Sequence, residues 1–352
     1  MQFSLEHRES LDHPAWLNLA SRSLVPGGLA RPELALAAFA QSPATRLATV
    51  TQAGELLAAL PVSGSRAATS HVSNAGVPLL DQTRGEAAFS ILLQGLQRPV
   101  LLTGLPATGP LWTAIQAASA HSTVLAGWER ASLNIVGNHD DWFLHNFDRK
   151  RRSRYRRNMS GLASLPDFQC ETLAAGAPVE PWLSEFLDLE AAGWKGKRGT
   201  ALHHAPAVAS SFEKAIGSLH ARGLLRFWRM TAGSEPIAMV MAIVERGQAS
   251  FSKIAFNENH AAASPGVMII LEATRSLFAE ENVKLIDSCA IPNHPMLDNI
   301  WRDRIAVCDA LVAGDSVSPV RFSIATAKYK AARRVRKTIR DVLYRARGWK
   351  PS

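Results

Sequence analysis

Three short apolar segments and one helical segment define the region from Leu224 to Asp287. The apolar segments are rich in β-branched and aromatic residues, turn-forming residues separate them, and they span 224–231, 236–244 and 249–256. Such runs predict strands, and their short connections predict antiparallel hairpins. Residues 267–281 then carry apolar side chains at helical spacing, and a strand-like run follows at 283–288. Few folds combine a three-strand meander with a helical crossover of this kind.

The start of the predicted helix is a candidate anion site. Pro265 suits a first helical position, and Ser264 is expected to cap the free amides. Gly266, followed by Val267, lets another group approach the backbone closely. Free N–H groups and the helix dipole favour anions at such a start. The alternative is an ordinary capped helix that binds nothing.

Composition sets limits on the class of protein. The chain has 352 residues, which is enough for two domains, and no apolar run has the length of a membrane span. Its polar N-terminus does not resemble a secretory signal, and its three cysteines have no metal-like spacing. We expect a cytoplasmic protein, without a metal site, whose thiols are reduced. The sequence does not indicate an oligomeric state.

The positive charge belongs to two segments. Residues 146–157 hold seven Lys or Arg and one Asp, and residues 321–350 hold eleven and one, whereas the whole chain has a net charge of only +9. The basic residues from Arg149 to Arg157 predict a helix with Asp148 as its cap. This helix can recognise phosphate or be a solvated face; nucleic acid is not favoured, because Tyr155 is the only aromatic residue among the basic side chains.

The element order suggests two α/β units and a tail. The second unit is expected to contain helices at 180–193, 205–223 and 297–304 and a final strand at 306–313. The first unit shows a similar order, with strands at 46–52, 55–62, 99–106 and 129–137 and helices at 85–96 and 110–119. We therefore predict domains at 1–145 and 146–318, an internal duplication whose first copy has lost its site, and a separate C-terminal helix at 319–352.

The C-terminal helix is basic and amphipathic. Its apolar face includes Ile324, Val335 and Ile339, and many Lys and Arg side chains surround that face. Such a helix can lie on an anionic membrane surface, which would make the protein peripheral to the inner face of the membrane. Alternatively, it packs on the protein body with its basic side in water.

Residues 146–301 resemble the GNAT-type acyltransferase domain of the cellulose-biosynthesis-associated branch, called CelD/BcsL-like. The matching features are the Arg-rich segment, a Glu-containing Gly-Trp-Lys-Gly block, the Ser-Pro-Gly helix start and an Asp with a downstream Trp. In this chain they are RKRRSRYRRN at 149–158, Glu190 with Gly193 to Gly196 and Gly199-Thr200, Ser264 to Gly266, and Asp287 with Trp301. Wider relatives include Fem-type transferases, which carry two GNAT-like halves.

The resemblance implies a fold, a donor and a donor site. The fold would be α/β (α+β), with tandem GNAT-like domains and a mixed, mostly antiparallel sheet flanked by helices. The donor would be acetyl-CoA or another acyl-CoA. Its pyrophosphate would lie at the start of the 267–281 helix, and its pantetheine would lie against the strand residues Lys253, Ile254 and Ala255 up to Phe256. The sequence departs from the commonest GNAT loop, because Ala262 to Gly266 supply fewer glycine amides.

Three side chains are candidates for the chemistry of acyl transfer, which needs a base and a polarised thioester carbonyl. His294 is a candidate base, since its ordinary pKa lies near physiological pH. Asp287 is placed to orient His294 or act as the base itself, and Glu190 is a third candidate. In the alternative reading, these residues are a turn cap, a loop histidine and a helix-end carboxylate.

Four further residues are candidates for binding the acceptor. Trp194 and Lys195 combine an aromatic ring and a cation in a Gly-rich loop, which suits a sugar or an anionic acceptor; the alternative is that Trp194 packs on the core. Arg152 and Arg156 are candidates for contacts to a phosphate.

Three functions follow from these observations. The first is an acyl-CoA-dependent N- or O-acyltransferase acting on a sugar, a polysaccharide precursor or another small acceptor. The second is a Fem-like transferase that uses an aminoacyl-tRNA donor. The third is a non-catalytic protein that binds an anionic surface.

Overall fold

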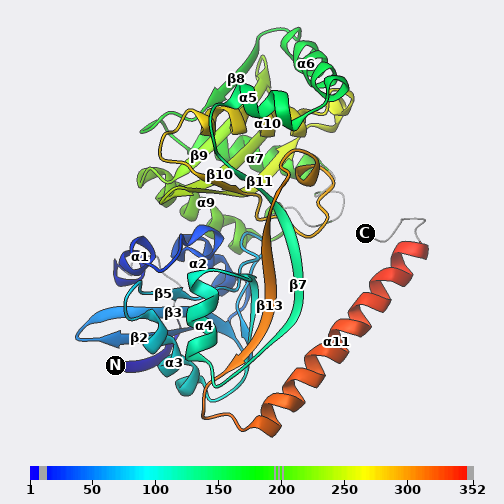
Figure 1. The fold of residues 1–352 in the computed structure, drawn as a ribbon. Helices are drawn as coiled ribbons and strands as arrows, with labels where there is room; N and C mark the ends of the chain where they lie inside the picture. Colours follow the sequence, from blue (N-terminus) through cyan, green and yellow to red (C-terminus); the bar gives the residue numbers. More distant parts are fainter. Residues whose placement is uncertain (8–13, 194–195, 197–198, 200–201, 347–352) are drawn as a thin grey trace.

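A computed structural model gives the architecture, and it describes residues 1–7, 14–193, 196, 199 and 202–346. Within these residues the strands form one continuous sheet (Figure 1). The strands are β1 (Gln2–Glu6), β2 (Arg46–Gln52), β3 (Glu55–Ser63), β4 (Arg66–Ala67), β5 (Leu79–Leu80), β6 (Val100–Pro106), β7 (His121–Asn134), β8 (Phe168–Thr172), β9 (Leu225–Ala232), β10 (Glu235–Glu245), β11 (Gln248–Phe256), β12 (Leu285–Asp287) and β13 (Asp303–Ala313). Their order in the sheet is β1-β2-β3-β4-β6-β13-β7-β12-β11-β10-β9-β8, and β5 pairs with β3.

Pairing in this sheet is mostly antiparallel. Among the described strands, the pairs β11–β12 and β4–β6 are parallel, and the other pairs are antiparallel. Each parallel pair requires a crossover, and a helix lies between its two strands in the sequence. The expected α/β class with a mixed, mostly antiparallel sheet and flanking helices is confirmed.

Helices cover both faces of the sheet. They are α1 (Pro14–Ser21), α2 (Pro32–Gln41), α3 (Gly85–Leu96), α4 (Pro110–Ala118), α5 (His139–Asn146), α6 (Arg149–Ala163), α7 (Glu180–Ala192), α9 (Pro206–Ala221), α10 (Pro265–Phe278) and α11 (Pro319–Ala346), with short 3-10 turns η1 (Gly28–Ala30), η2 (Leu202–His204), η3 (Glu258–Ala263) and η4 (Leu297–Asn299). In the C-terminal half, α10 packs on one sheet face and α7 with α9 on the other. In the N-terminal half, α3 and α4 oppose α1 and α2.

Two long strands join the halves. β13 pairs with β6 through its C-terminal part and with β7 along its whole length, while β7 also pairs with β12 (Figure 1). A buried ion cluster adds a second link between the halves. Arg31, next to α2, contacts both Glu33 of α2 and Glu245 of β10. All three side chains are almost fully buried, so the halves share a charged contact as well as a sheet.

The meander and its crossover helix form as the sequence predicted, and so do the helices at α6, α7 and α9. Asp148 caps α6 by accepting from the Arg151 N–H, and Gly193 follows the end of α7. Two expected elements were wrong. The helix expected at 297–304 is only the turn η4, because β13 already begins at Asp303. The strand expected at 129–137 is part of β7, which begins at His121 and ends at Asn134.

Candidate functional site

The last strand of the meander, β11, is longer than the part of it that pairs with β12. β11 pairs in parallel with β12 only over Gln248 to Ser250, because β12 ends at Asp287 while β11 continues to Phe256. Within the described chain, no strand pairs with this edge of β11 beyond Ser250. The last six residues of β11, from Phe251 to Phe256, therefore extend past its pairing with β12.

A bulge bends β11 where the opening begins. Val240 of β10 lies opposite Ile254, and Ala242 lies opposite Phe251, so two residues of β11 face one of β10 between these pairs. A bulge of this kind bends the strand and re-aims its side chains. The second half of β11 therefore turns away from β12.

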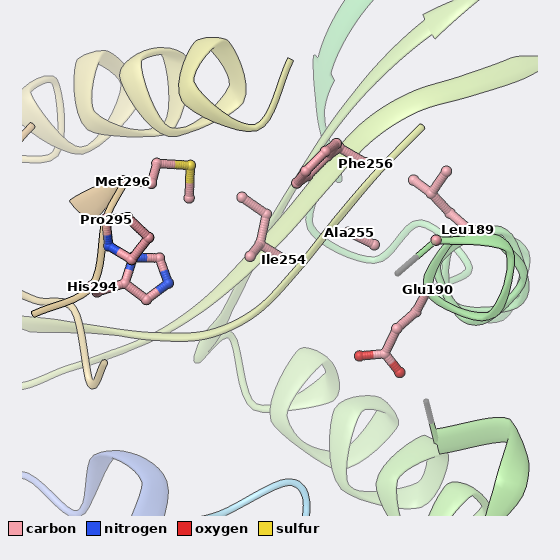
Figure 2. A pocket seen from close by; sticks show the side chains of 9 residues that line it. Leu189, Glu190, Ile254, Ala255, Phe256, His294, Pro295 and Met296 are labelled. Carbon is pink, nitrogen blue, oxygen red and sulfur yellow. The ribbon is translucent and has the colours of Figure 1, made fainter. Parts of the chain in front are cut away.

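A cavity of about 320 Å³ lies beside the last residues of β11, from Ile254 to Phe256. Its lining comes from the end of α7, the end of β11 and the loop after β12, and is mostly apolar (Figure 2). The lining residues are Leu189, Glu190, Gly193, Ile254, Ala255, Phe256, His294, Pro295 and Met296. Two of the three predicted catalytic residues, Glu190 and His294, thus share one cavity, on opposite sides of β11 (Figure 2).

Glu190 is held in place within this wall. Its side chain is 1% exposed; Oε2 accepts a hydrogen bond of 3.0 Å from the Leu202 N–H, and Oε1 lies 3.5 Å from Lys253 Nζ. The cation and the amide both stabilise the carboxylate form. The geometry therefore links Glu190 to Lys253 of β11, a residue predicted to bind the cofactor.

His294 is oriented by the backbone of the following turn. Its Nδ1 accepts a hydrogen bond of 3.2 Å from the Leu297 N–H. In a neutral imidazole one nitrogen accepts and the other carries the proton. This bond therefore places the proton on Nε2, and a neutral His294 can donate a hydrogen bond from that atom.

Asp287 lies outside the cavity wall. Its Oδ2 forms a 2.6 Å ion pair with Arg130 Nη2 of β7, and its Oδ1 accepts a 2.9 Å hydrogen bond from the Cys289 N–H. Burial, together with the Asp287 carboxylate, holds the pKa of the Cys289 thiol far above its usual value. A protonated thiol is a poor nucleophile, so this thiol is not suited to carry an acyl group.

The start of α10 differs in detail from the expectation. Ser264 occupies the N-cap position with φ 51° and ψ 56°, and its side chain makes no capping hydrogen bond, so the predicted side-chain cap is wrong. The left-handed backbone instead directs the Ser264 carbonyl at the N–H groups of Val267 and Met268, at 2.9 and 3.1 Å. A Cβ at Gly266 would lie 3.0 Å from the Phe256 ring and 3.5 Å from Met296 Sδ, so the cavity wall reaches this helix start.

Of the predicted acceptor residues, the two that the structure describes, Arg152 and Arg156, do not line the cavity. Trp194 and Lys195 lie outside the described residues. Arg152 donates to the carbonyls of Leu144 and Phe147 and so fixes the end of α5 on α6. Arg156 is exposed on α6, a helix that contacts η3 and α10 next to the predicted pyrophosphate position.

Sequence reasoning missed the cavity residues Leu189, Pro295 and Met296 and the partner Arg130. Leu189 and Met296 have apolar side chains that are typical of a core. Arg130 is 157 positions away from Asp287, so no local signal in the sequence links these two residues. The described residues hold no group of three or more His, Cys, Asp or Glu side chains placed for a metal. The same residues include no helix with both the length and the apolarity to cross a bilayer.

Comparisons with known proteins agree with this geometry. Residues 149–294 match the family model described as an acetyltransferase (GNAT) domain. No curated protein matches the chain.

Solved structures share the whole architecture at low identity. The C-terminal domain (DUF2156) of a putative lysylphosphatidylglycerol synthetase from Agrobacterium fabrum has a TM-score of 0.55 at 10% identity, covering 90% of this chain and 95% of its own. FemX has a TM-score of 0.54 at 10% identity, covering 88% and 96%. A conserved protein of unknown function from Bacteroides thetaiotaomicron has a TM-score of 0.53 at 12% identity, covering 88% and 100%. Residues 149–294 are therefore similar to a GNAT-type acetyltransferase domain, within a fold similar to that of FemX and the DUF2156 domain.

Proposed function

We propose that the protein is an acyl-CoA-dependent acyltransferase that transfers the acyl group directly to its acceptor. One observation carries this proposal: β11 extends six residues past its pairing with β12, and a cavity lies between this end of the strand and the start of α10. An extended ligand with amide groups, such as the pantetheine arm, can lie along this end of β11 within the cavity. Its thioester then reaches the cavity that Glu190 and His294 line.

The start of α10 is the proposed site for the pyrophosphate. Pro265 has no N–H, and the Ser264 carbonyl takes the N–H groups of Val267 and Met268, which leaves the Gly266 amide as the donor of the first turn. The helix dipole adds to the attraction for an anion. Pyrophosphate binding there requires the Phe256 and Met296 side chains to turn aside from Gly266.

The proposed reaction is a single displacement. The acceptor oxygen or nitrogen attacks the thioester carbonyl, the C–S bond breaks, and the acceptor proton ends on the CoA thiolate. In this proposal the Nε2–H of His294 donates to the carbonyl oxygen and stabilises the charge that develops there, and the bond from the Leu297 N–H to Nδ1 supports this tautomer. Asp287, through Arg130 and the Cys289 amide, fixes the start of the loop that carries His294.

The proposed acceptor is a hydroxyl or amine of a sugar or a polysaccharide precursor, or of another small molecule. The resemblance to the CelD/BcsL-like branch and the Trp194-Lys195 pair support this class. We place the catalytic unit at 146–318 and assign 1–145 to a second, degenerate copy. Two similar crossovers support the duplication. In the N-terminal half, α3 lies in sequence between the parallel strands β4 and β6, and in the C-terminal half, α10 lies between the parallel strands β11 and β12.

Calorimetry with acetyl-CoA tests the donor. Ile254→Trp fills the cavity beside β11 and is expected to weaken acetyl-CoA binding by about tenfold or more, which is about 1.4 kcal/mol. Val136→Trp, at a position that is 80% exposed and outside the cavity, is the matched control and should bind as the parent protein does. No acetyl-CoA binding by the parent at millimolar concentration would refute the proposal.

An aminoacyl-tRNA donor is the second candidate. It is favoured by the basic surface of α6, where seven Lys or Arg side chains fall within 149–157 on a helix that contacts η3 and α10. A tRNA donor predicts tRNA binding whose affinity falls steeply with salt and is reduced by Arg154→Gln with Arg157→Gln. Acetyl-CoA binding without tRNA binding would remove this candidate.

A further inference from the structure

Among the described side chains of the C-terminal helix α11, one side contacts β7, β13 and the segment around Ser65. Tyr329 donates a 2.9 Å hydrogen bond to the Ser65 carbonyl, Arg333 lies 3.5 Å from Asp309 of β13, and the Phe322 ring packs on His121. Burial raises the pKa of Tyr329, in keeping with its place in this contact. The helix is therefore seated on the body through a defined face and leaves its other sides in solvent.

A second face of α11 carries exposed apolar side chains. Val320, Ile324, Val335 and Ile339 are between 51% and 67% exposed, and spacings of four and eleven residues place them along one stripe. A monomeric protein rarely leaves an aligned row of aliphatic side chains in water without a use for it. The helix has 28 residues, so it is about 42 Å long, and its far end stands away from the sheet (Figure 1).

A groove runs between this stripe and the body. It has a volume of about 510 Å³, and its apolar lining includes Pro99, Ile324, Ala325 and Ala332. Four cations, Arg98, Arg321, Lys328 and Arg336, also line it. Ile324 belongs to both the stripe and the groove, so the two form one continuous surface, with apolar side chains between positive ones.

The charge of α11 selects the kind of partner. The helix holds nine Lys or Arg residues and one Asp, Asp341, whereas the whole chain has a net charge of +9. Basic side chains that flank an apolar stripe match the interface of an anionic bilayer, where headgroups meet the cations and acyl chains meet the stripe. Nucleic acid would pair with the cations alone and would leave the aliphatic row in water.

We propose that α11 and its groove, defined by Arg98, Arg321, Ile324, Lys328, Val335 and Ile339, dock the protein on an anionic lipid surface. The catalytic cavity is lined by α7, β11 and the loop after β12, so this surface is a separate site. Membrane docking would keep the enzyme beside acceptors that are themselves attached to a bilayer.

Vesicle sedimentation of the full chain tests this proposal. Vesicles of phosphatidylcholine with phosphatidylglycerol in equal parts should bind the protein, and vesicles of phosphatidylcholine alone should not. Arg321→Gln with Lys328→Gln removes two cations of the groove and should weaken the partition coefficient about thirtyfold. Lys214→Gln with Arg302→Gln, at two exposed positions outside α11, removes the same charge and should have little effect.

A second pair of variants separates lipid from nucleic acid. Ile324→Ser with Ile339→Ser should weaken vesicle binding about tenfold without changing the charge. If this variant binds vesicles as tightly as the parent, the stripe does not enter the bilayer and the proposal is wrong. Equal binding to neutral and anionic vesicles would also overturn it, as would an RNA oligomer that competes the protein fully off the vesicles. Calorimetry with acetyl-CoA on the same variants checks that the catalytic domain is intact.

Discussion

Lys253 Nζ lies 3.5 Å from Oε1 of Glu190, which ties the bulged part of β11 to the last turn of α7. Both side chains are nearly buried, at 11% and 1% exposure, and Glu190 also accepts from the Leu202 N–H. The pair therefore links α7, which lines the cavity through Leu189 and Glu190, to β11. Its contribution to stability and its contribution to donor binding can be separated.

A double-mutant cycle measures the coupling of this pair. Glu190→Gln, Lys253→Met and the double variant should show a coupling energy of about 2 kcal/mol in urea unfolding, because each single change leaves a buried charge with fewer partners. Acetyl-CoA affinity, measured on the same proteins, should fall for both single variants. Additive effects on the free energy of unfolding would show that the two groups act independently.

Substitutions of His294 distinguish an acid from a base. His294→Gln keeps an N–H donor in the side chain, whereas His294→Ala removes it. If the Nε2–H polarises the thioester, His294→Ala should lower kcat by about a hundredfold or more, whereas His294→Gln should retain part of the parent kcat. Acetyl-CoA affinity should be unchanged in both variants. A role as base predicts that both variants lose activity equally, together with the acidic limb of the pH–rate profile.

Substitutions of Asp287 test whether this residue positions the loop that carries His294. Asp287→Asn keeps an acceptor for the Cys289 N–H but weakens the ion pair with Arg130. We expect kcat to fall by about tenfold with little change in KM, because the loop that leads to His294 loses its anchor. Arg130→Lys, which keeps the charge, should recover most of the activity of Arg130→Met. Direct action of Asp287 as the base instead predicts a loss like that of His294→Ala, with no effect of Arg130.

Elements with local signals were predictable from the sequence. Asp148 and Gly193 mark helix ends through backbone chemistry that needs no tertiary contact, and the meander strands are short runs between turn residues. The first part of β7 was missed because it alternates between half-buried and exposed positions along a bridging ribbon and never buries a continuous face. The side-chain cap predicted for Ser264 failed because its left-handed backbone turns the carbonyl, and not the hydroxyl, toward the helix amides.

The candidate site depends on contacts between distant segments. Glu190 and His294 were singled out from the sequence, but only the parallel pairing of β11 with a short β12 brings their segments to one cavity. No periodicity predicts that β12 ends at Asp287 while β11 continues for six more residues. The same holds for β13, whose pairing with both β6 and β7 joins positions about 200 residues apart.

The buried cluster of Arg31, Glu33 and Glu245 should dominate the mutational stability of the chain. Arg31 is 1% exposed; its Nη2 and Nε lie 2.9 and 3.1 Å from the Glu33 carboxylate, and its Nη1 contacts Glu245. Arg31→Met removes the cation that the two buried carboxylates share, leaves Glu33 only the more distant Arg222 at 3.7 Å, and should cost about 4 kcal/mol in urea unfolding. Arg302→Met, at an exposed position, should change stability by less than about 0.5 kcal/mol. A small effect of Arg31→Met would mean that water enters the cluster.

Cys308 predicts how stability changes at alkaline pH. Its thiol is 1% exposed on β13, and burial, with Asp309 adding a negative charge, raises its pKa to about 11 from 9.0. Because the folded-state pKa is the higher one, the native protein binds the proton more tightly between these two values. The contribution of the Cys308 proton to the free energy of unfolding is therefore fully present below about pH 9. It is lost as pH rises toward 11, at up to about 1.4 kcal/mol per pH unit.

Urea unfolding at pH 8 and pH 10 measures this loss. Cys170, Cys289 and Tyr329 also have raised pKa values, and their titration lowers stability in the same pH direction, so the parent protein alone does not isolate Cys308. Cys308→Ala removes its titration and should lower the difference in unfolding free energy between the two pH values by about 1 kcal/mol. If Cys308→Ala leaves the pH dependence unchanged, the thiol is hydrated in the native protein.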